Sequence, residues 1–427
     1  MACRVNRLST RTPARLSSAL NVQTIRAQIP ATAKQVYLNT GWQGPSPLAV
    51  IRAVQTAFQA EAEGPTAPPI HEERLAEFRR CRQALAALVG ASAEELSIQQ
   101  NTTEGINLVL SGMGLRAGDE IITVSGEHSS VIVPVYYARE RYGANLRIVR
   151  VSGTDFPADI LARFQELATP ALRLIALSHV SYSTGQLFPV RELAALAHER
   201  GALLLLDAAQ SVGQLPVDVH ELDCDFCAFP GHKWLLGPAA TGALYVRREL
   251  IPRIQPAKVS HHASAFYNFK DRFETKGDTI DKFEMTTVSV PLLAGLNAAI
   301  HYTAGIGFEA IAERAAGLAR YATKGLSEIP GARLISPPES ASVRTGIVSF
   351  ALANVPAAVL TAHLWESERV VARTVPDAAC TRLCFHVFNT EAEADTAVGI
   401  VQAAAQRGVP EGDHPSIQIE SDAMVEL

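Results

Sequence analysis

The feature that most constrains the fold is an alternation of short apolar strands with helices through the first two thirds of the chain. Strands are predicted at 96–100, 120–125, 146–151, 172–179, 202–207, 226–229 and 242–246, and helices at 72–89, 103–110, 131–141 and 190–200. Strands that alternate with helices form a mostly parallel sheet covered on both faces. We therefore predict an α/β fold whose large domain has a mostly parallel seven-stranded sheet flanked by helices.

The pattern changes near residue 306. A long helical stretch at 308–329 precedes predicted strands at 347–351 and 382–387 and a helix at 391–407, which indicates a smaller α+β C-terminal domain. We place an N-terminal segment and the large domain at 28–305, the small domain at 306–412 and a tail at 413–427. Residues 1–27 contain five arginines and no acidic residue, so we expect a disordered extension there, with a targeting peptide as the alternative.

Composition excludes several classes of function. The 427 residues carry 38 Lys and Arg against 43 Asp and Glu, a net charge of −5, whereas nucleic-acid binders usually present a basic face. No apolar run approaches the roughly 18 residues that span a bilayer. Six cysteines are too few for a disulfide framework and favour a reducing compartment. We expect a cytoplasmic protein with neither a nucleic-acid nor a membrane partner, organelle targeting being the alternative.

Cys224 and Cys227 form a C-x-x-C, a spacing that can hold zinc or carry redox chemistry. They lie in an apolar, strand-like run, and residues three apart in a strand face opposite sides. We therefore expect structural cysteines here, and no metal site in the chain.

Asp207 and Lys233 carry the strongest chemical signal. Asp207 ends a run of four leucines, at the carboxyl end of a predicted strand, where open α/β sheets bind ligands. Lys233 lies among aromatic, apolar and glycine residues, and burial would make its amine nucleophilic. Separately they have ordinary explanations as a turn residue and a loop lysine. Together they suit pyridoxal phosphate, with Lys233 as the Schiff-base residue and Asp207 keeping the pyridine nitrogen protonated.

The motifs D-x-x-Q, P-V-D-V, D-C-D-F and G-H-K that run from Asp207 to Lys233 resemble the class V aminotransferase superfamily. This superfamily belongs to the fold-type I pyridoxal phosphate enzymes and includes the cysteine desulfurases. The resemblance covers residues 37–400 and implies that Gln210 contacts the cofactor's phenolic oxygen and His232 its phosphate. Pro230 stands where the family often has a phosphate-binding Ser.

Three further motifs fit the same family. Thr102 and Thr103 begin a predicted helix in T-T-E-x-I-N; they are ordinary helix-capping residues by themselves, and phosphate ligands by the resemblance. His128 matches the histidine that stacks on the pyridine ring, and we assign it a catalytic as well as a cofactor-binding role. Thr287 matches a Thr that reaches the phosphate of the neighbouring subunit, which implies a homodimer with a shared active site.

The C-terminal domain determines the reaction. The resemblance implies that Arg382 grips the substrate α-carboxylate and that Arg373 holds a second acidic group or the other end of the substrate. Tyr182 stands where desulfurases have a substrate-binding Asn. Desulfurases carry a mobile loop with a catalytic cysteine between the two arginines, but only eight residues separate them here. Cys380 and Cys384 are predicted on a strand, where a persulfide-forming thiol would not be exposed.

The short loop, the D-x-x-C-x-R-x-C-x-H pattern that begins at Asp377 and the N-T-G-W-Q-G-P segment resemble the cysteine/cystine C–S lyase branch more closely than the desulfurases. We therefore expect a pyridoxal phosphate-dependent lyase or transferase that acts on a small amino acid. Lys233 would be the base in a β-elimination that yields pyruvate, ammonia and a sulfur product from cysteine, cystine or a cysteine S-conjugate. An aminotransferase, a cysteine desulfurase, an amino-acid epimerase and a non-catalytic cofactor-binding scaffold remain alternatives.

Overall fold

A computed structural model describes residues 20–338 and 345–410. Most of the predicted extension at 1–27 and all of the predicted tail at 413–427 lie outside these residues. Helix α1 (Val22–Ala27) already forms before residue 28, with Ile25 buried, so the expected start of folded structure was placed too late. No helix in the described part of the chain is long and apolar enough to cross a membrane.

The large domain is built on a seven-stranded sheet with the order β2-β8-β7-β6-β5-β3-β4. Every strand runs parallel to its neighbours except β8, which is antiparallel to both β2 and β7. The predicted mostly parallel sheet of seven strands is therefore confirmed. The strands are β2 (Leu96–Gln99), β3 (Glu120–Val124), β4 (Asn145–Val149), β5 (Leu172–Ser178), β6 (Leu203–Asp207), β7 (Phe226–Pro230) and β8 (Gly242–Val246).

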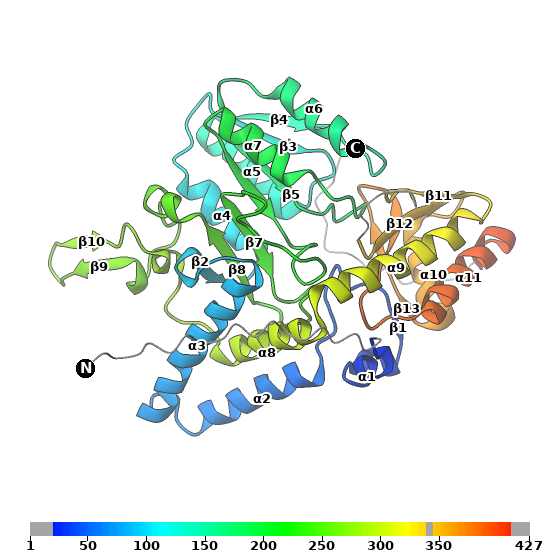
Figure 1. Cartoon of the computed structure of the whole chain (residues 1–427), viewed down its shortest axis with the longest axis horizontal. Helices are drawn as coiled ribbons and strands as arrows, with labels where there is room; N and C mark the ends of the chain where they lie inside the picture. The colour runs from blue at the N-terminus through cyan, green and yellow to red at the C-terminus, as the bar shows by residue number, and fades with distance from the viewer. Residues whose placement is uncertain (1–19, 339–344, 411–427) are drawn as a thin grey trace, which may run out of the picture.

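Helices cover both faces of this sheet, which makes three layers (Figure 1). Leu204 and Leu206 of β6 face one hydrophobic cluster, and Leu205 faces the other. Because both faces are buried, the strand is a continuous apolar run without alternation. One face is covered by α3 (Pro68–Leu88), α6 (Pro157–Leu167), α7 (Val190–Glu199) and α8 (Val290–Ile306), and the other by α4 (Thr102–Gly112) and α5 (Ser129–Tyr142).

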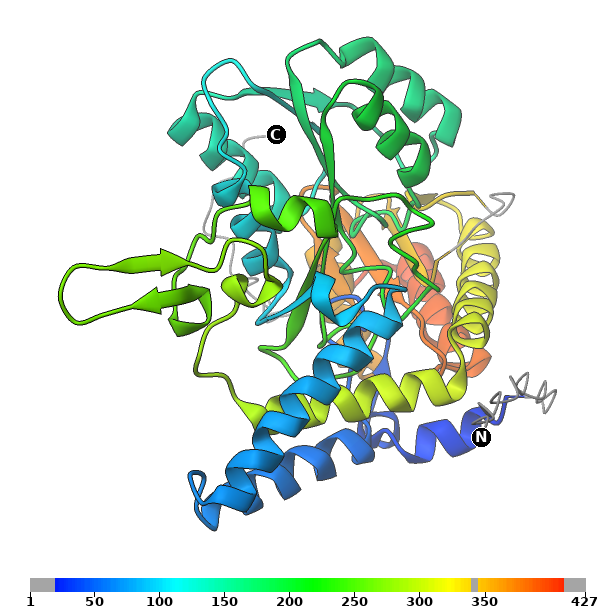
Figure 2. The ribbon, with the colours of Figure 1, turned by 60° about the vertical axis from the view of Figure 1, so that its left-hand side comes forward.

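Helices α2 (Leu48–Ala62) and α3 pack against α8 along one side of the molecule (Figure 2). Helix α8 was not predicted, and neither were α2, α6 or α10 (Ala357–Glu368). Since α8 lies between two helices and the sheet, it is apolar on most sides and lacks the one-sided pattern of a surface helix. A hairpin of β9 (Ser264–Tyr267) and β10 (Phe273–Thr275) projects from the large domain (Figure 2).

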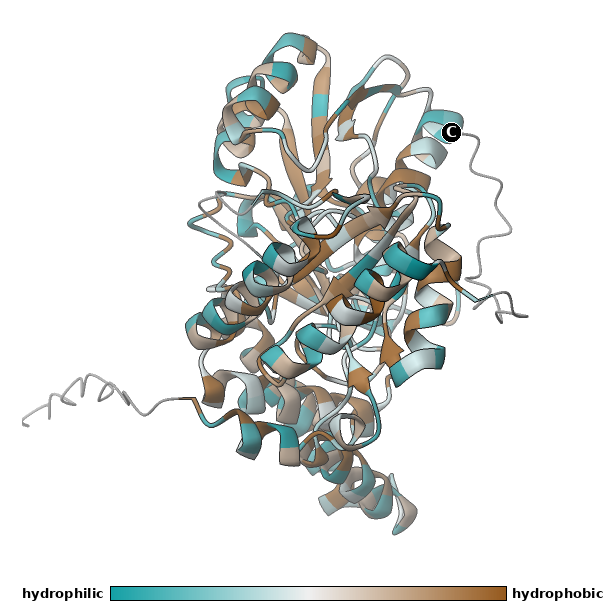
Figure 3. Ribbon diagram, turned by 90° about the vertical axis from the view of Figure 1, so that its right-hand side faces the viewer, coloured by the Kyte–Doolittle hydropathy of each residue, from teal (hydrophilic) through white to brown (hydrophobic). Residues whose placement is uncertain are grey.

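The small domain is a four-stranded antiparallel sheet with three helices. The sheet order is β11-β12-β15-β14, and Figure 3 shows apolar strands beneath helices whose outer sides are polar. Its elements are β11 (Ala332–Leu334), β12 (Ile347–Leu352), β14 (Arg373–Val375), β15 (Cys380–Cys384), α9 (Phe308–Ser327), α10 and α11 (Glu391–Arg407).

The N-terminal segment also belongs to the small domain. Strand β1 (Val36–Tyr37) pairs in parallel with β13 (Val370–Val371), and Ile25 of α1 packs in one cluster with Val387 and Phe388. The described part of the chain therefore begins on the small domain at residue 20, passes the junction between the domains at residues 39–46, and only then builds the large domain. The predicted unit 28–305 does not separate this segment, although the boundary near residue 306 falls at the end of α8.

Candidate active site

A cavity of about 200 Å³ lies beyond the carboxyl end of β6, at the junction of the two domains. Open α/β sheets bind ligands at this edge. Six of the predicted site residues line it, namely Thr102, Thr103, His128, His232, Lys233 and Arg373, together with Trp42, Asn101, Ser130, Ala209 and Pro230.

One end of the cavity suits an anion. The side chain of Asn101 caps α4 by accepting a hydrogen bond from Glu104 N at 2.9 Å, and the residues that begin the helix, Asn101 to Thr103, line the cavity. Thr102 Oγ1 and His232 Nδ1 are buried without a hydrogen-bond partner among the described residues. Buried polar atoms without partners at a helix N-terminus fit a bound phosphate group. Thr103 donates a hydrogen bond to Ser130 at 2.7 Å.

The charges of Lys233 and Asp207 interact at the base of the site. Burial lowers the pKa of Lys233 to about 8, and the charge of Asp207 opposes this shift. Burial also raises the pKa of Asp207, while the Lys233 charge lowers it. Asp207 ends β6 and its Oδ1 accepts a hydrogen bond from Ala209 N at 2.8 Å. A buried amine and carboxylate in this arrangement suit the aldehyde and the pyridine nitrogen of pyridoxal phosphate.

The N-T-G-W-Q-G segment packs directly on the lysine loop. Gly44 N donates a hydrogen bond to His232 O at 2.7 Å, and a Cβ at Gly44 would lie 2.2 Å from the carbonyl oxygen of Lys233. Only glycine permits this approach. The segment brings Trp42 to the cavity.

His128 is the N-cap of α5, and its ring is fixed from two sides. Its Nδ1 accepts a hydrogen bond from Ser130 N at 3.1 Å, and its ring meets that of Tyr182 edge to face at 4.9 Å. Burial, and then the charges of Lys233, Arg373 and Arg382, lower its pKa to about 3. His128 therefore stays neutral and offers a flat ring to the cavity.

Gln210 lies behind the cavity. Its Nε2 donates to Gly41 O at 2.9 Å, and its Oε1 accepts from Trp234 Nε1 at 2.9 Å. Both ends of the Gln210 amide already have hydrogen-bond partners. A contact with the phenolic oxygen of the cofactor would therefore have to use Nε2 as a donor to two acceptors, and this contact stays a prediction.

Arg382 and Arg373 come together on the small domain. They are register partners on β15 and β14, and Arg382 is fully buried. Arg382 donates to Tyr182 O at 2.7 Å and to Asn39 Oδ1 at 3.4 Å. The Tyr182 hydroxyl donates to Asp377, so the aromatic ring is clamped between the two domains.

Thr287 is a predicted site residue that lies away from this cavity. It is exposed and lines two other pockets, one with Gln100 and Glu104 and one with Leu75 and His262. Within one chain the predicted phosphate contact of Thr287 is not made.

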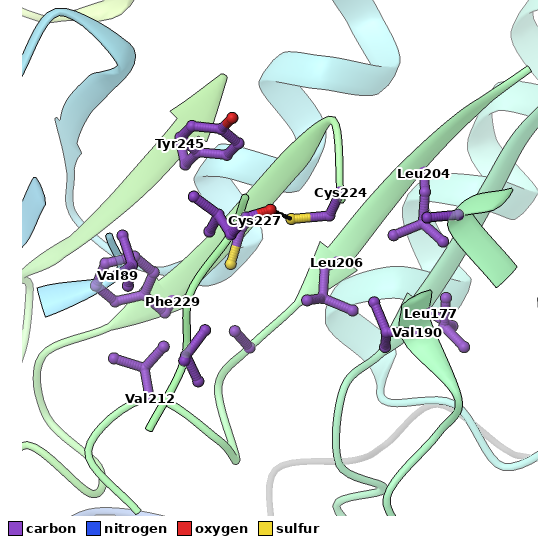
Figure 4. Packing of buried hydrophobic residues seen from close by; sticks show 14 of the residues in the cluster. Val89, Leu177, Val190, Leu204, Leu206, Val212, Cys224, Cys227, Phe229 and Tyr245 are labelled. Atoms are coloured by element: carbon purple, nitrogen blue, oxygen red, sulfur yellow. Dashed lines mark hydrogen bonds between the residues drawn. The ribbon is translucent and has the colours of Figure 1, made fainter. Parts of the chain in front are cut away.

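Cys224 and Cys227 contact each other, which corrects the expectation that they face opposite sides. Cys224 precedes β7 instead of lying on it, so the strand argument did not apply to it, and a thiol hydrogen bond to Cys224 raises the pKa of Cys227. Figure 4 shows both in the buried cluster. The Cys224 thiol also donates to the carbonyl oxygen of Val219 at 3.7 Å. Within 20–338 and 345–410, no three His, Cys, Asp or Glu side chains are placed to hold a metal.

Four residues at the site were missed as site residues from sequence. Asn101 and Ser130 have the appearance of ordinary helix-start residues, and Trp42 lies in a segment that was noted without a role. Asp377 begins the D-x-x-C-x-R-x-C-x-H pattern and was given no role, because its contact with Tyr182 joins residues 195 positions apart in the chain.

Comparisons with known proteins agree with this geometry. Residues 36–398 match the family model "Aminotransferase class-V". The cysteine desulfurase of Enterobacter sp. (strain 638) is 33% identical over 408 residues, which cover 88% of this chain and 96% of the relative. That of Haloferax volcanii is 32% identical over 354 residues, which cover 79% and 81%.

Solved structures give the same result. The cystine C–S lyase C-DES in complex with its reaction product cysteine persulfide is 29% identical with a TM-score of 0.81, covering 88% of this chain and 99% of that one. A C-DES mutant with glycine covalently linked to its PLP cofactor is 28% identical, also at 0.81, covering 88% and 98%. The apo cysteine desulfurase of Thermococcus onnurineus NA1 is 26% identical at 0.83, covering 91% and 99%. These matches span most of the chain, which belongs to the class V aminotransferase family.

Proposed function

We propose that this chain is a pyridoxal phosphate-dependent C–S lyase. With water, it would convert cysteine to pyruvate, ammonia and sulfide, or cystine to pyruvate, ammonia and cysteine persulfide, and S-conjugates would react in the same way. The similarity to C-DES, a cystine C–S lyase, supports this reaction class.

The residues present fit the cofactor. Thr102, Thr103 and His232 would hold its phosphate, His128 its ring face, and Asp207 its pyridine nitrogen. The unpartnered Thr102 hydroxyl and His232 ring nitrogen are the observations that favour this orientation. When bound, pyridoxal phosphate supplies an aldehyde that captures amines and a ring that accepts electrons from a breaking bond.

Lys233 and Arg382 would act on the substrate. A pKa of about 8 leaves part of the Lys233 amine unprotonated near neutral pH, so it can take the α-proton of the substrate. Arg382 would hold the α-carboxylate, because its Nε is buried and without a partner among the described residues. Tyr182 fixes the position of Arg382 through its carbonyl oxygen.

The tight β14–β15 hairpin is the observation that favours a lyase over a desulfurase. Only residues 376–379 connect the strands, and Ala379 N donates to Pro376 O at 2.9 Å to close the turn. Cys380 and Cys384 lie on β15 and are both fully buried. A turn this short cannot carry a thiol to the substrate sulfur, whereas β-elimination needs no enzyme thiol.

Cysteine desulfurase is the second candidate, because the curated relatives carry that name. Cys384 would then be the sulfur acceptor. Its thiol lies beside the substrate-binding arginine, since a Cβ built on Gly41 would lie 2.8 Å from Cys384 Sγ and 3.5 Å from Arg382 Nη2.

A product assay tests the choice. Purified holoenzyme would be given L-cysteine, L-cystine and S-conjugates, and pyruvate, alanine and sulfide would be followed. A lyase forms pyruvate without alanine, and Cys384→Ser and Cys380→Ser keep its rate. Alanine formation that is lost in Cys384→Ser and kept in Cys380→Ser would establish desulfurase chemistry instead.

We also propose a homodimer in which Thr287 serves the partner's site. Thr287 is exposed away from its own cavity, beside a second pocket of about 340 Å³. Leu75 and Met285 line that pocket while 47% and 39% exposed, and large apolar residues gathered at a surface pocket mark an interface. The cytoplasm remains the proposed compartment, and the five described cysteines are all free, as thiols are in reducing surroundings.

A further inference from the structure

Glu127 is a buried carboxylate that the proposed function leaves without a role. It lies in the loop between β3 and α5, immediately before His128, and it is 7% exposed. Strand β5 lies between β3 and β6 in the sheet, and its last residue, Ser178, is the register partner of Asp207. Since Glu127 contacts Ser178, it lies at the same edge of the sheet as the cofactor site.

The Glu127 carboxylate accepts hydrogen bonds from both of its neighbours. Its Oε1 accepts from His128 N at 2.8 Å and from the Ser178 hydroxyl, and its Oε2 accepts from Ser178 N at 2.7 Å. Donors that point at a carboxylate stabilise its charged form. The ionised side chain therefore ties the start of α5, where His128 is the N-cap, to the end of β5.

The bond to His128 N connects this carboxylate to the cavity, which His128 lines. The His128 ring accepts a hydrogen bond from Ser130 N, a contact within one helical turn that orients the ring relative to α5. The carboxylate adds a second constraint, because it fixes the His128 backbone relative to the last residue of β5. Both together fix the ring relative to the sheet and so to Asp207 on the next strand.

We propose that Glu127 is a positioning residue whose ionised carboxylate holds the His128 ring against the cofactor, and that protonation of Glu127 loosens His128. The inference goes beyond the proposed function, in which Glu127 takes no part. It rests on the cofactor site proposed there, but not on the reaction that the cofactor serves.

The surroundings of Glu127 place this change near neutral pH. Burial raises its pKa to about 7; the charge of Asp207 adds to the rise, and the hydrogen-bond donors oppose it. Lys233 acts on Asp207 and on His128. His128 and His179, the ionisable side chains next to the contact, stay neutral, because burial lowers their pKa values to about 3 and about 4. Glu127 is thus ionised above about pH 7 and protonated below it.

Glu127→Gln tests the carboxylate. The amide nitrogen of glutamine is a donor, so in either orientation of the amide His128 N or Ser178 N loses its acceptor. Hydrogen exchange of the holoenzyme is measured by mass spectrometry in the peptide that contains His128, and the dissociation constant of pyridoxal phosphate is measured by titration. We expect the protection factor of this peptide to fall about tenfold and the dissociation constant to rise about tenfold.

Glu120→Gln is the matched control. Glu120 is also buried, but it lies at the other end of β3 and binds Arg147 and Thr169. Its substitution should leave both the His128 peptide and the dissociation constant unchanged. Equal effects of the two substitutions would show a general loss of stability and overturn the proposal.

The pH profile separates positioning from a purely structural role. In wild type the protection of the His128 peptide should fall as the pH drops through about 7. Ser178→Ala removes a donor that lowers the pKa of Glu127, so the midpoint should move to higher pH. This variant also decides the matter if Glu127→Gln does not fold: an unmoved midpoint, or constant protection in wild type, rejects the proposal.

Two further outcomes are decisive. If Glu127→Gln loses protection but binds pyridoxal phosphate as tightly as wild type, the cofactor does not depend on where Glu127 holds His128, and the proposal is overturned. If wild type binds no pyridoxal phosphate, the proposed function and the cofactor side of this inference both fail. If the cofactor binds but no pyruvate forms, the lyase assignment alone fails, because neither measurement depends on the reaction.

Discussion

At the scale of single residues, the surroundings of Lys233 decide its reactivity. A lysine has an ordinary pKa of 10.5, at which almost none of the amine is free near neutral pH, and burial brings this one to about 8. The first prediction is that uptake of pyridoxal phosphate by the cofactor-free protein rises about tenfold per pH unit up to about pH 8 and then levels, because only the unprotonated amine reacts with the aldehyde. Stopped-flow absorbance measures this rate.

Asp207 provides the control for this prediction. Its charge holds the pKa of Lys233 up against burial, so Asp207→Asn should move the levelling point to lower pH. A rate that keeps rising to pH 10 would show that Lys233 titrates as an exposed lysine.

Thr102 gives the second prediction. Its hydroxyl is buried and has no hydrogen-bond partner in the part of the chain that the structure describes, and a buried unsatisfied group costs about 1–3 kcal/mol. Thr102→Val should stabilise the cofactor-free protein by about 1 kcal/mol in urea unfolding and weaken cofactor binding by about 10- to 100-fold, since a hydrogen bond to a charged phosphate is lost.

Thr103→Val is the matched comparison, because the Thr103 hydroxyl already has Ser130 as a partner. It should not stabilise the cofactor-free protein. If Thr102→Val destabilises that protein, its hydroxyl has a structural partner and the phosphate assignment fails.

At the scale of elements, the β14–β15 hairpin sets the chemistry by keeping its turn short and fixed. Ala379 closes the turn with a φ of 46°, in the left-handed region where a Cβ costs about 1–2 kcal/mol. The third prediction is that Ala379→Gly stabilises the protein by about 0.5–1 kcal/mol, after the greater entropy of unfolded glycine is subtracted. Denaturant unfolding measures this gain, and pyruvate formation should not change.

Ala378→Gly tests the reason, because Ala378 has no positive φ and glycine there only adds entropy to the unfolded chain. It should destabilise. A stabilisation by both substitutions would mean that the turn conformation is not the cause.

At the scale of the whole molecule, the active site depends on segments that cross from one domain to the other. Residues 39–44 leave the small domain and pass beneath the lysine loop, while Thr287 faces away from the cavity of its own chain. The fourth prediction is that Lys233→Ala and Thr287→Ala, each impaired alone, regain about a quarter of wild-type activity when equal amounts are unfolded and refolded together. Half of the random dimers are then mixed, and each mixed dimer has one intact site.

The baseline activity is that of the Lys233→Ala and Thr287→Ala proteins mixed in equal amounts without unfolding, so that subunits are not exchanged. Recovery no greater than the sum of the separate activities, in a sample that light scattering shows to be dimeric and exchanged, would place the Thr287 contact within one chain or nowhere.

Much of the fold could be predicted because the spacing of apolar residues along the sequence reflects which sides of each helix and strand are buried. The apolar run before Asp207 indicated a strand buried on both faces, and β6 is such a strand. The motifs from Asp207 to Lys233, together with those at Thr102, His128 and Thr287, indicated the family and the cofactor. Helix α8 escaped prediction because burial on most sides removes the periodicity on which a prediction depends.

The sequence by itself determined the layered α/β architecture, the family and the set of reactive side chains, since these are written in periodicity and in short motifs. Only the tertiary structure decided which of these side chains meet. It placed Arg373 beside Arg382, engaged both ends of Gln210 and turned Thr287 outward. Contacts such as those of Arg382 with Tyr182 and of Gln210 with Gly41 join residues 200 and 169 positions apart, and their distances depend on how strands pair and chains cross, which no local pattern records.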